Sequence, residues 1–241
     1  FNPKQKPQQG SFKMALMDCT TSQIILGSST NVCLKRCFIR SSDGSTSMLP
    51  EDQQYRELSR ELNCILWAKV LLDIVYKFIA REDAALTAQP PFAIPQLHFV
   101  EAALVVARRA DHEELYMMEE RISDSGLGSG FFMKYICNSS GQPLFLRGTS
   151  SHVTERNRCA CFLSFAQHVQ YVRTAKLAFT SDFQGAGDLL TDPQIITSPD
   201  LGNQLFARGN VAFETMLNTH ECTGNEFCEY YKLPREGFAL A

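Results

Sequence analysis

A long segment with helical periodicity separates two groups of short strand-like segments, and it is the feature that most limits the possible folds. Residues 50–83, PEDQQYRELSRELNCILWAKVLLDIVYKFIARED, begin with acids and continue with apolar residues at helical spacing. We expect one stripe of this helix to face a core. The stripe consists of Leu58, Leu62, Ile65, Leu66, Leu72, Val75, Phe78 and Ile79.

The segments on both sides of this helix predict strands. Residues 11–19, 23–29 and 31–40 form one series of short apolar or alternating segments, and residues 97–109, 114–122 and 130–136 form another. Residues 158–180 predict a helix followed by a strand that leads to Asp182, and residues 210–219 predict a further helix. Strands arranged around one long helix indicate an α+β fold.

The composition excludes several classes of protein. With 241 residues, of which 44% are hydrophobic and 20% charged, the chain can bury the core of one large domain or of two lobes. A net charge of -3 argues against a protein whose main function is to bind the phosphate backbone of nucleic acids. No stretch of 18 apolar residues and no signal peptide is present. We therefore expect a soluble intracellular, cytoplasmic protein with neither membrane nor nucleic-acid partners.

The stretch SDFQGAGDLLTDPQI, residues 181–195, gathers acids, an amide and glycines between apolar runs. A dinucleotide fingerprint would need glycine at Leu190, and no G-K-[ST] follows, so neither that reading nor a P-loop applies. Asp182 and Gln184 share a face if residues 180–184 are extended, and Asp192 follows beyond a turn. Such oxygen ligands suit Mg²⁺ and phosphoryl transfer, although turns and caps use the same residues.

A second group, NTHECTGNEFCEYY at residues 218–231, contains His220, Cys222 and Cys228. These can supply three of the four ligands of a tetrahedral zinc site, with the fourth coming from elsewhere. The alternative is that the cysteines are small buried hydrophobic residues. The nine cysteines are odd in number and scattered, which favours reduced thiols with one metal cluster over a disulfide framework.

Residues 182–195, DFQGAGDLLTDPQI, closely resemble the signature D-[IL]-Q-G-V-G-[DE]-x-x-T-D-P of the alpha-kinases, which are atypical serine/threonine protein kinases. In the same register, NVCLKRCF places Lys35 at the position of the family's nucleotide-binding lysine. The segment EERISDSGLGSGFFMKYICN resembles the family's hinge and next strand. That segment offers Glu119 or Glu120, Lys134 and Asn138.

The resemblance implies a two-lobed catalytic domain over residues 1–241, with an N-lobe of about 1–118 and a C-lobe of about 119–241 that carries a zinc module. Such a domain transfers the γ-phosphoryl group of Mg-ATP to a Ser or Thr hydroxyl of a protein substrate. HVQYV lies where the family has its zinc histidine, which makes His168 the fourth ligand beside His220, Cys222 and Cys228.

The resemblance also implies the role of each residue of the nucleotide site. Lys35 would contact the ATP phosphates, Asp182 and Gln184 would handle metal and phosphate, and Asp192 would face the transferred phosphoryl group. Mg²⁺ would be bound by Gln184 and Asp192, with Asn203 completing its shell. Glu119 or Glu120 would lie at the hinge beside adenine, and Lys134 and Asn138 would be further nucleotide contacts. The remaining histidines, His98, His112 and His152, are read as structural or surface residues, and Cys159 and Cys161 as core thiols.

Two segments depart from the family pattern. Five residues separate Cys222 from Cys228, two more than usual, and the glycine-rich loop reads GNQLFARG at residues 202–209 without its middle glycine. The altered loop supports a rival reading, in which the chain is an ATP-binding pseudokinase that acts as an interaction module. A zinc-dependent nucleic-acid binder is a third reading, and the lack of a Lys/Arg stripe beside the Cys/His group counts against it.

Overall fold

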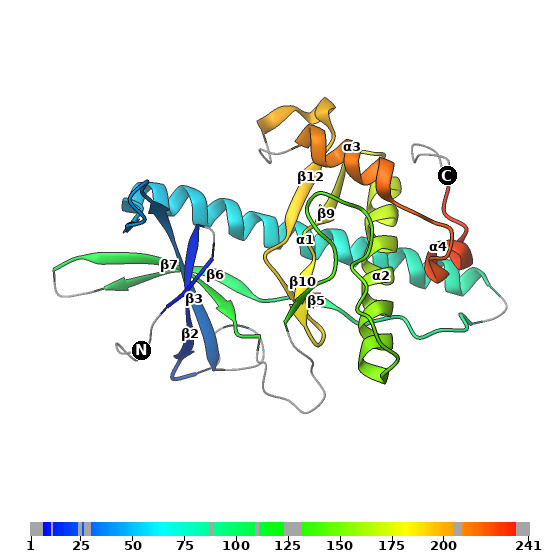
Figure 1. Ribbon diagram of the computed structural model, residues 1–241, viewed down its shortest axis with the longest axis horizontal. Coiled ribbons are helices and arrows are strands. Elements are labelled where there is room, and N and C mark those ends of the chain that lie inside the picture. Colours follow the sequence, from blue (N-terminus) through cyan, green and yellow to red (C-terminus); the bar gives the residue numbers. More distant parts are fainter. Residues whose placement is uncertain are drawn as a thin grey trace. The chain divides into compact units, whose positions relative to one another are not determined.

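The computed structural model describes residues 7–10, 12–23, 26, 30–86, 89–108, 111–122, 132–204 and 209–234. The chain forms two compact units (Figure 1). Unit 1 contains residues 1–65 and 100–123, and unit 2 contains residues 66–99 and 124–241. Strands and helices alternate irregularly along the chain, so the predicted α+β class is confirmed. The division into lobes of about 1–118 and 119–241 stays a prediction.

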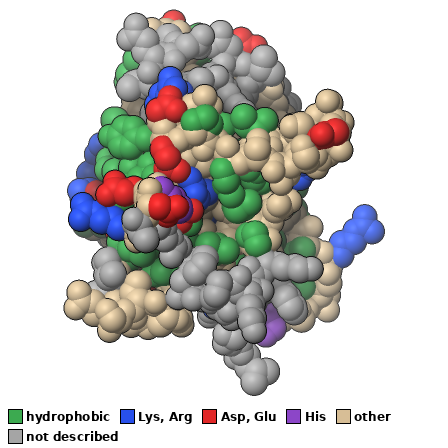
Figure 2. All heavy atoms as spheres, turned by 90° about the vertical axis from the view of Figure 1, so that its left-hand side faces the viewer, with side chains coloured by type: hydrophobic (Ala, Val, Ile, Leu, Met, Phe, Trp, Pro, Cys, Tyr) green, Lys and Arg blue, Asp and Glu red, His purple; other side chains and the backbone are tan. Residues whose placement is uncertain are grey.

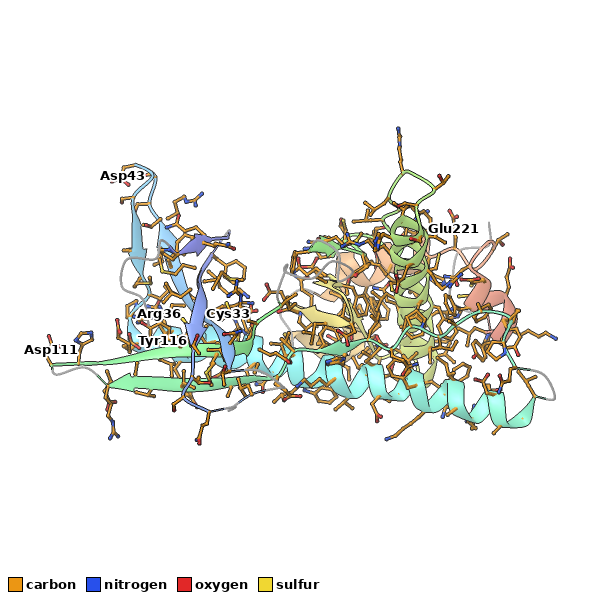
Figure 3. All side chains as sticks on the ribbon, turned by 90° about the horizontal axis from the view of Figure 1, so that it is seen from below. Cys33, Arg36, Asp43, Asp111, Tyr116 and Glu221 are labelled. Carbon is orange, nitrogen blue, oxygen red and sulfur yellow. The ribbon has the colours of Figure 1, made fainter. Side chains whose placement is uncertain are left out.

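Unit 1 is built on an antiparallel sheet with the strand order β1-β2-β3-β7-β6, in which β4 also pairs with β3. Two hairpins of this sheet, β3–β4 and β6–β7, carry Asp43 and Asp111 at their tips (Figure 3). The strands are β1 (Gln8–Gln9), β2 (Lys13–Thr20), β3 (Asn31–Arg40), β4 (Thr46–Met48), β6 (Ala102–Arg108) and β7 (Glu113–Glu120).

The two faces of the unit 1 sheet differ in character. One face carries a core of Cys19, Val32 and Met118, against which Leu34 and Val105 pack. Because side chains alternate along a strand, Lys35 of β3 and Glu119 of β7 point to the other face. The alternation read from NVCLKRCFIR therefore predicted the strand β3 correctly.

Helix α1 (Glu51–Ala85) corresponds to the long predicted helix. Its predicted stripe is buried at Leu58, Ile65, Leu72, Val75, Phe78 and Ile79. Leu62 is partly buried, whereas Leu66 is 47% exposed and lies beside the exposed Trp67. The prediction for Leu66 was wrong because the residue stands at the edge of the apolar stripe, where spacing alone does not decide burial.

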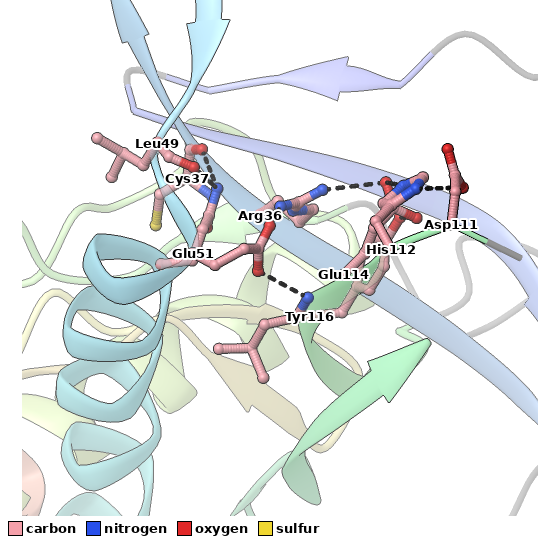
Figure 4. A network of polar contacts seen from close by, with 10 residues as sticks. Arg36, Cys37, Leu49, Glu51, Asp111, His112, Glu114 and Tyr116 are labelled. Atoms are coloured by element: carbon pink, nitrogen blue, oxygen red, sulfur yellow. Dashed lines mark hydrogen bonds and ion pairs between the residues drawn. The ribbon is translucent and has the colours of Figure 1, made fainter. Parts of the chain in front are cut away.

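The start of α1 is fixed to the sheet by a polar network (Figure 4). Gln54, fully buried, donates to the carbonyl of Cys37 at 2.7 Å and accepts from its N–H at 2.9 Å. Arg36 pairs with Glu51 and with Glu114, and its guanidinium lies over the ring of Tyr116. Glu51 also accepts from the Leu115 N–H. These contacts hold strand β3, which carries Lys35, against the helix.

Unit 2 contains two small sheets beside helices. The strand order β5-β11-β10-β8 forms one sheet, and β12 pairs with β9 in the other. The strands are β5 (His98–Phe99), β8 (Met133–Lys134), β9 (Ala178–Ser181), β10 (Gln184–Ala186), β11 (Leu189–Thr191) and β12 (Gln194–Thr197). The helices are α2 (Ser151–Arg173), the 3-10 helix η1 (Pro199–Gln204), α3 (Gly209–Thr219) and α4 (Glu226–Tyr231).

The core of unit 2 is aromatic. Phe162 and Phe165 of α2 meet Phe227 of α4 with ring centroids 5.4 and 5.8 Å apart, and Phe78 and Tyr231 add to this cluster. A second cluster joins Tyr171, Phe179, Ile196, Phe213 and Met216. Helix α2 begins seven residues before the predicted start at 158, because the Ser150 side chain caps it by accepting from the Val153 N–H.

Several predictions fall partly outside the described residues. The predicted strand at residues 23–29 and most of the glycine-rich segment 202–209 belong to this group. Within the part that the structure describes, α1 and the other helices are too short or too polar to cross a bilayer. On the face shown in Figure 2, basic side chains lie next to acidic ones around a hydrophobic area.

Candidate active site and metal centre

One interrupted hairpin carries the three residues singled out in the acidic stretch. Strands β9 and β10 pair with β12 and β11 in one unbroken register, with Ser181 opposite Gln194 and Gln184 opposite Thr191. Residues 182–183 and 192–193 therefore face each other in the gap between the two ladders. Sequence positions ten residues apart are brought together by this pairing, which spacing alone did not show.

The gap exists because both chains leave the extended conformation at an aspartate. Asp182 has φ 58° and Asp192 has φ 47°, a left-handed conformation that is uncommon for residues other than glycine. The condition that residues 180–184 run as one extended strand is therefore not met. Strained backbone of this kind is often kept where a side chain must point in a required direction.

The glycines of QGAG serve the hairpin. A Cβ at Gly185 would lie 1.9 Å from the carbonyl oxygen of Leu189, and Gly187 has φ 61° at the turn. Any side chain at Gly185 would force the two strands apart. The glycine pattern that resembles part of a nucleotide fingerprint therefore has a purely local cause in this chain.

Lys134 contributes a positive charge to the same hairpin. In the pairing of β8 with β10, Lys134 lies opposite Gln184. Its Nζ is 2.6 Å from Oδ1 of Asp182, a carboxyl group that is 12% exposed. The backbone N–H of Tyr135 donates to the carbonyl of Phe183 at 2.8 Å, and Phe183 itself is fully buried. Lys134, Asp182 and Gln184 thus form one group.

Two buried amides of α2 hold the strand that leads to Asp182. Gln167 donates to the carbonyl of Thr180 at 2.9 Å, and Gln170 accepts from the Thr180 N–H at 2.7 Å. Both glutamines are fully buried. They were not among the predicted site residues. Polar residues within the apolar run CACFLSFAQHVQYV could have indicated them, because a buried amide needs hydrogen-bond partners.

In unit 1, Lys35 forms a buried ion pair. Its Nζ lies 2.7 Å from Oε2 of Glu119, and the two side chains are 11% and 3% exposed. Glu120 is also buried but lies on the opposite face of β7, since neighbouring residues of a strand alternate. Glu119 is therefore the one that positions the lysine. This contact was not predicted for either glutamate.

The four predicted zinc ligands come together in unit 2. One ligand atom from each of His168, His220, Cys222 and Cys228 lies within 4.8 Å of the others. Cys222 Sγ is 3.4 Å from His168 Nδ1, and Cys228 Sγ is 3.7 Å from His220 Nε2. A tetrahedral zinc ion with ordinary bond lengths would separate such N and S ligands by about 3.6 Å.

The other nitrogen of each imidazole is already bonded. His168 Nε2 lies 2.9 Å from the carbonyl of Pro234, and His220 Nδ1 lies 3.2 Å from Ser164 Oγ. The Ser164 hydroxyl donates to the Gly141 carbonyl, so it accepts from His220. Each histidine therefore turns an unprotonated nitrogen towards the cysteines, as metal-binding histidines do.

The electrostatics of the cluster favour a thiolate at Cys222. Hydrogen bonding from the Cys228 thiol lowers the pKa of Cys222 far below its usual value. The hydrogen bond that the Cys228 thiol donates to Cys222, and then burial, raise the pKa of Cys228. Burial lowers the pKa of His220, which keeps that imidazole neutral. Neutral imidazole and thiolate are the forms that bind zinc.

Asn225 shapes the longer loop between the two cysteines. Its side chain caps α4 by accepting from the N–H groups of Phe227 and Cys228, and its amide donates to the Cys161 carbonyl at 2.9 Å. Gly224, with φ 79°, provides the preceding turn. The two extra residues therefore fold into a capped turn, and both cysteines remain in the cluster.

The remaining predicted residues are more dispersed. Asn138 is exposed in a turn next to Cys137, whose carbonyl accepts from the Ser181 hydroxyl. Asn203 belongs to η1, and its side chain lies outside what the structure describes. Cys159 is buried and Cys161 is partly buried, and burial raises the pKa of both thiols to about 11. Exposed residues include His98, His112 and His152.

Comparison with known proteins identifies the family. The model of the alpha-kinase family matches residues 9–228, which is most of the chain. This protein belongs to the alpha-kinase family. Its resemblance to the family signature is thereby confirmed over far more of the chain than the motif itself.

One curated relative resembles part of this alpha-kinase domain. Myosin heavy chain kinase B of Dictyostelium discoideum is 37% identical over 79 residues, which are 33% of this chain and 10% of that protein. The chain therefore aligns with about a tenth of that relative's length.

The fold also has solved counterparts. The alpha-kinase domain of myosin-II heavy chain kinase A in complex with AMP-PNP has a TM-score of 0.60 at 19% identity. That comparison covers 98% of this chain and 88% of the other. The ADP complex of the same domain has a TM-score of 0.59 at 19% identity, with 97% and 88% covered.

Proposed function

We propose that this alpha-kinase domain is a serine/threonine protein kinase that transfers the γ-phosphoryl group of Mg-ATP to a protein hydroxyl. The observation that carries the proposal is the interrupted hairpin, in which Asp182 and Asp192 both adopt strained backbone conformations in one gap. Family membership supports it. Structures of the related domain of myosin-II heavy chain kinase A in complex with AMP-PNP and ADP support the nucleotide as ATP.

Phosphoryl transfer depends on positioning and on neutralising charge. Lys35, held by Glu119, is the residue we assign to the ATP phosphates. We assign Asp192 to the acceptor hydroxyl, whose proton it would receive. Asp182 stays beside Lys134, whose ammonium orients its carboxylate. Glu120 remains a proposed hinge residue beside adenine, Asn138 a proposed nucleotide contact and Asn203 a proposed member of the magnesium shell, without an assigned step.

Magnesium fits the hairpin because its donors are carboxylate and amide oxygens, which hard cations prefer. Gln184 and Asp192 are the residues that would hold it, as the resemblance implies, with Asp182 beside them. When bound, the ion supplies positive charge at the phosphate oxygens. Asp182 Oδ1 already faces the ammonium of Lys134, which indicates that this position is built for a cationic partner.

Zinc fits the cluster of His168, His220, Cys222 and Cys228. The two histidines present their unprotonated nitrogens, and the four ligand atoms leave no open position for water. We therefore propose a structural zinc that ties α2 to the segment 220–228. Metal analysis of purified protein should find one zinc per chain in the wild type and much less in Cys228→Ser.

The test of the proposed activity is transfer of labelled phosphate from ATP to a protein or peptide that contains Ser or Thr. Wild-type protein should transfer phosphate, and Asp192→Ala should lose transfer while its circular dichroism spectrum is unchanged. Asp73→Ala, which removes an exposed acid of α1, should behave as wild type. Retained transfer by Asp192→Ala contradicts the assignment. ATP binding without transfer by the wild type would instead indicate a pseudokinase.

A further inference from the structure

A cavity of about 240 Å³ lies in unit 2 beside the turn of the β10–β11 hairpin. The first residues of α2 form one wall, and the segment before β5 forms another. Tyr76 fixes that segment, because its hydroxyl contacts the carbonyls of Pro95 and Leu97 at 2.9 and 3.1 Å. The lining residues are Pro95, Gln96, Leu97, Tyr135, His152, Glu155, Arg156, Cys159, Gly187 and Asp188.

Tyr135 offers an unused polar group to this cavity. The residue is 2% exposed, and its backbone is bonded to Phe183 and Leu144. Its hydroxyl has no hydrogen-bond partner among the residues that the structure describes. Burial raises the pKa of Tyr135 to about 12, so the hydroxyl keeps its proton at neutral pH. The hydroxyl is not closed off inside the core but is open to the cavity, where a ligand or water can complete its hydrogen bonds.

The rim of the cavity is acidic on balance. Glu155 and Asp188 are both exposed there. Arg156 is the one guanidinium among the lining residues, and its Nη1 lies 3.3 Å from Met133 Sδ on β8. Among the described residues, the side chains that could together hold a metal ion are His168, His220, Cys222 and Cys228, and none of them lines this cavity. The acidic rim is therefore better suited to an organic cation than to a metal ion.

We propose that this cavity binds a lysine or arginine side chain of the protein substrate. This inference rests on the proposed kinase function. The walls formed by Pro95 and Leu97 accept the aliphatic stem, and the Tyr135 hydroxyl accepts a hydrogen bond from the cationic head. The Tyr135 ring adds a cation–π contact, and Glu155 and Asp188 neutralise the charge.

The hairpin sets the distance between this basic residue and the phosphate acceptor. Asp188 at the turn and Asp192 in the gap are joined by β11, and four residues of extended chain span about 13 Å. A substrate that runs alongside in an extended conformation needs about the same number of residues. The preferred substrate therefore carries Lys or Arg about four positions from its Ser or Thr.

The test uses peptides with one Ser or Thr and a single Arg moved from five positions before it to five positions after it. Wild-type protein should give its lowest KM when Arg lies about four positions away on one side. Glu155→Gln and Asp188→Asn should each raise that KM about tenfold with little change in kcat. For the peptide without Arg, both variants should match wild type. Glu214→Gln, which removes an exposed acid of α3 outside the cavity, is the matched control.

A second measurement separates this proposal from the proposed activity. Fluorescence anisotropy with labelled peptides in which Ala replaces Ser reports binding even if no phosphate is transferred. Preferential binding of the Arg peptide supports the cavity even if the transfer assay fails, provided that Glu155→Gln weakens this binding at every salt concentration tested. Equal binding of the peptides with and without Arg overturns it. A preference for phosphoserine that disappears in Arg156→Gln also overturns it, since the cavity would then bind anions.

Discussion

The buried pair of Lys35 and Glu119 yields a quantitative prediction for Glu119→Gln. The change keeps the size of the side chain and removes its charge, so Lys35 loses its counter-ion while both groups stay out of water. Breaking a buried pair costs about 3–5 kcal/mol. Because a glutamine oxygen can still accept one hydrogen bond from Lys35, we expect a loss near the lower end, about 3 kcal/mol.

The assay is urea unfolding followed by circular dichroism. With a urea m-value of about 2–3 kcal/mol/M, the loss corresponds to a midpoint lower by about 1–1.5 M. Glu120→Gln is the matched control, because Glu120 is the next residue, is similarly buried and points to the face of β7 opposite to that of Glu119 and Lys35. It should lose much less.

A double variant makes the reasoning refutable. Lys35→Met combined with Glu119→Gln removes both charges, so it should be more stable than Glu119→Gln alone. The activity of Glu119→Gln should also fall, by about tenfold or more, because Lys35 loses its fixed position. Equal losses in Glu119→Gln and Glu120→Gln, or no rescue in the double variant, would show that the pair does not contribute as argued.

Three further predictions concern unit 2. Gln170→Leu leaves the Thr180 N–H buried without a partner, so the free energy of unfolding should fall by about 1–3 kcal/mol and transfer activity should also fall. Gln142→Leu, at an exposed amide, should change neither quantity. Phe227→Ala removes a fully buried ring from the aromatic core and should lower the free energy of unfolding by about 3–5 kcal/mol, measured from the urea midpoint. Phe145→Ala, which removes an exposed ring, is the control. A smaller loss for Phe227→Ala than for Phe145→Ala would contradict the packing described. Burial raises the pKa of Tyr76 and of Tyr135 to about 12, above the usual value near 10, so the unfolded chain gives up these protons first. The contribution of the two tyrosines to stability should therefore be constant below pH 10 and fall as pH rises from 10 to 12. Tyr76→Phe should show a shallower fall over this range in the same unfolding titration.

Much of the secondary structure could be predicted because it follows from local patterns. Helix α1 was predicted within a few residues, since 35 residues of helical periodicity with acids at the start leave little choice. The strands β2, β3, β6 and β7 followed from short alternating runs. The start of α2 and the exposure of Leu66 were wrong, because a capping serine and the edge of a stripe depend on their surroundings.

By itself, the sequence determined which residue types were available for chemistry and their order along the chain. The sequence could offer two sets of candidates because each stands in a motif with characteristic residue types and spacing: Asp182, Gln184 and Asp192, and His168, His220, Cys222 and Cys228. The family followed from the same restriction. None of this required knowledge of distance, because motifs are local and resemblance compares them one at a time.

The tertiary structure alone decided which of these residues meet. Only the pairing of β8 with β10 places Lys134 beside Asp182. Only the register of β3 with β7 selects Glu119 over Glu120 for Lys35. Only helix packing brings Gln167 and Gln170 to Thr180. These contacts join residues far apart in the chain, and their formation depends on the whole core being packed. The cavity lined by Tyr135 arises in the same way, from four segments that share no sequence pattern.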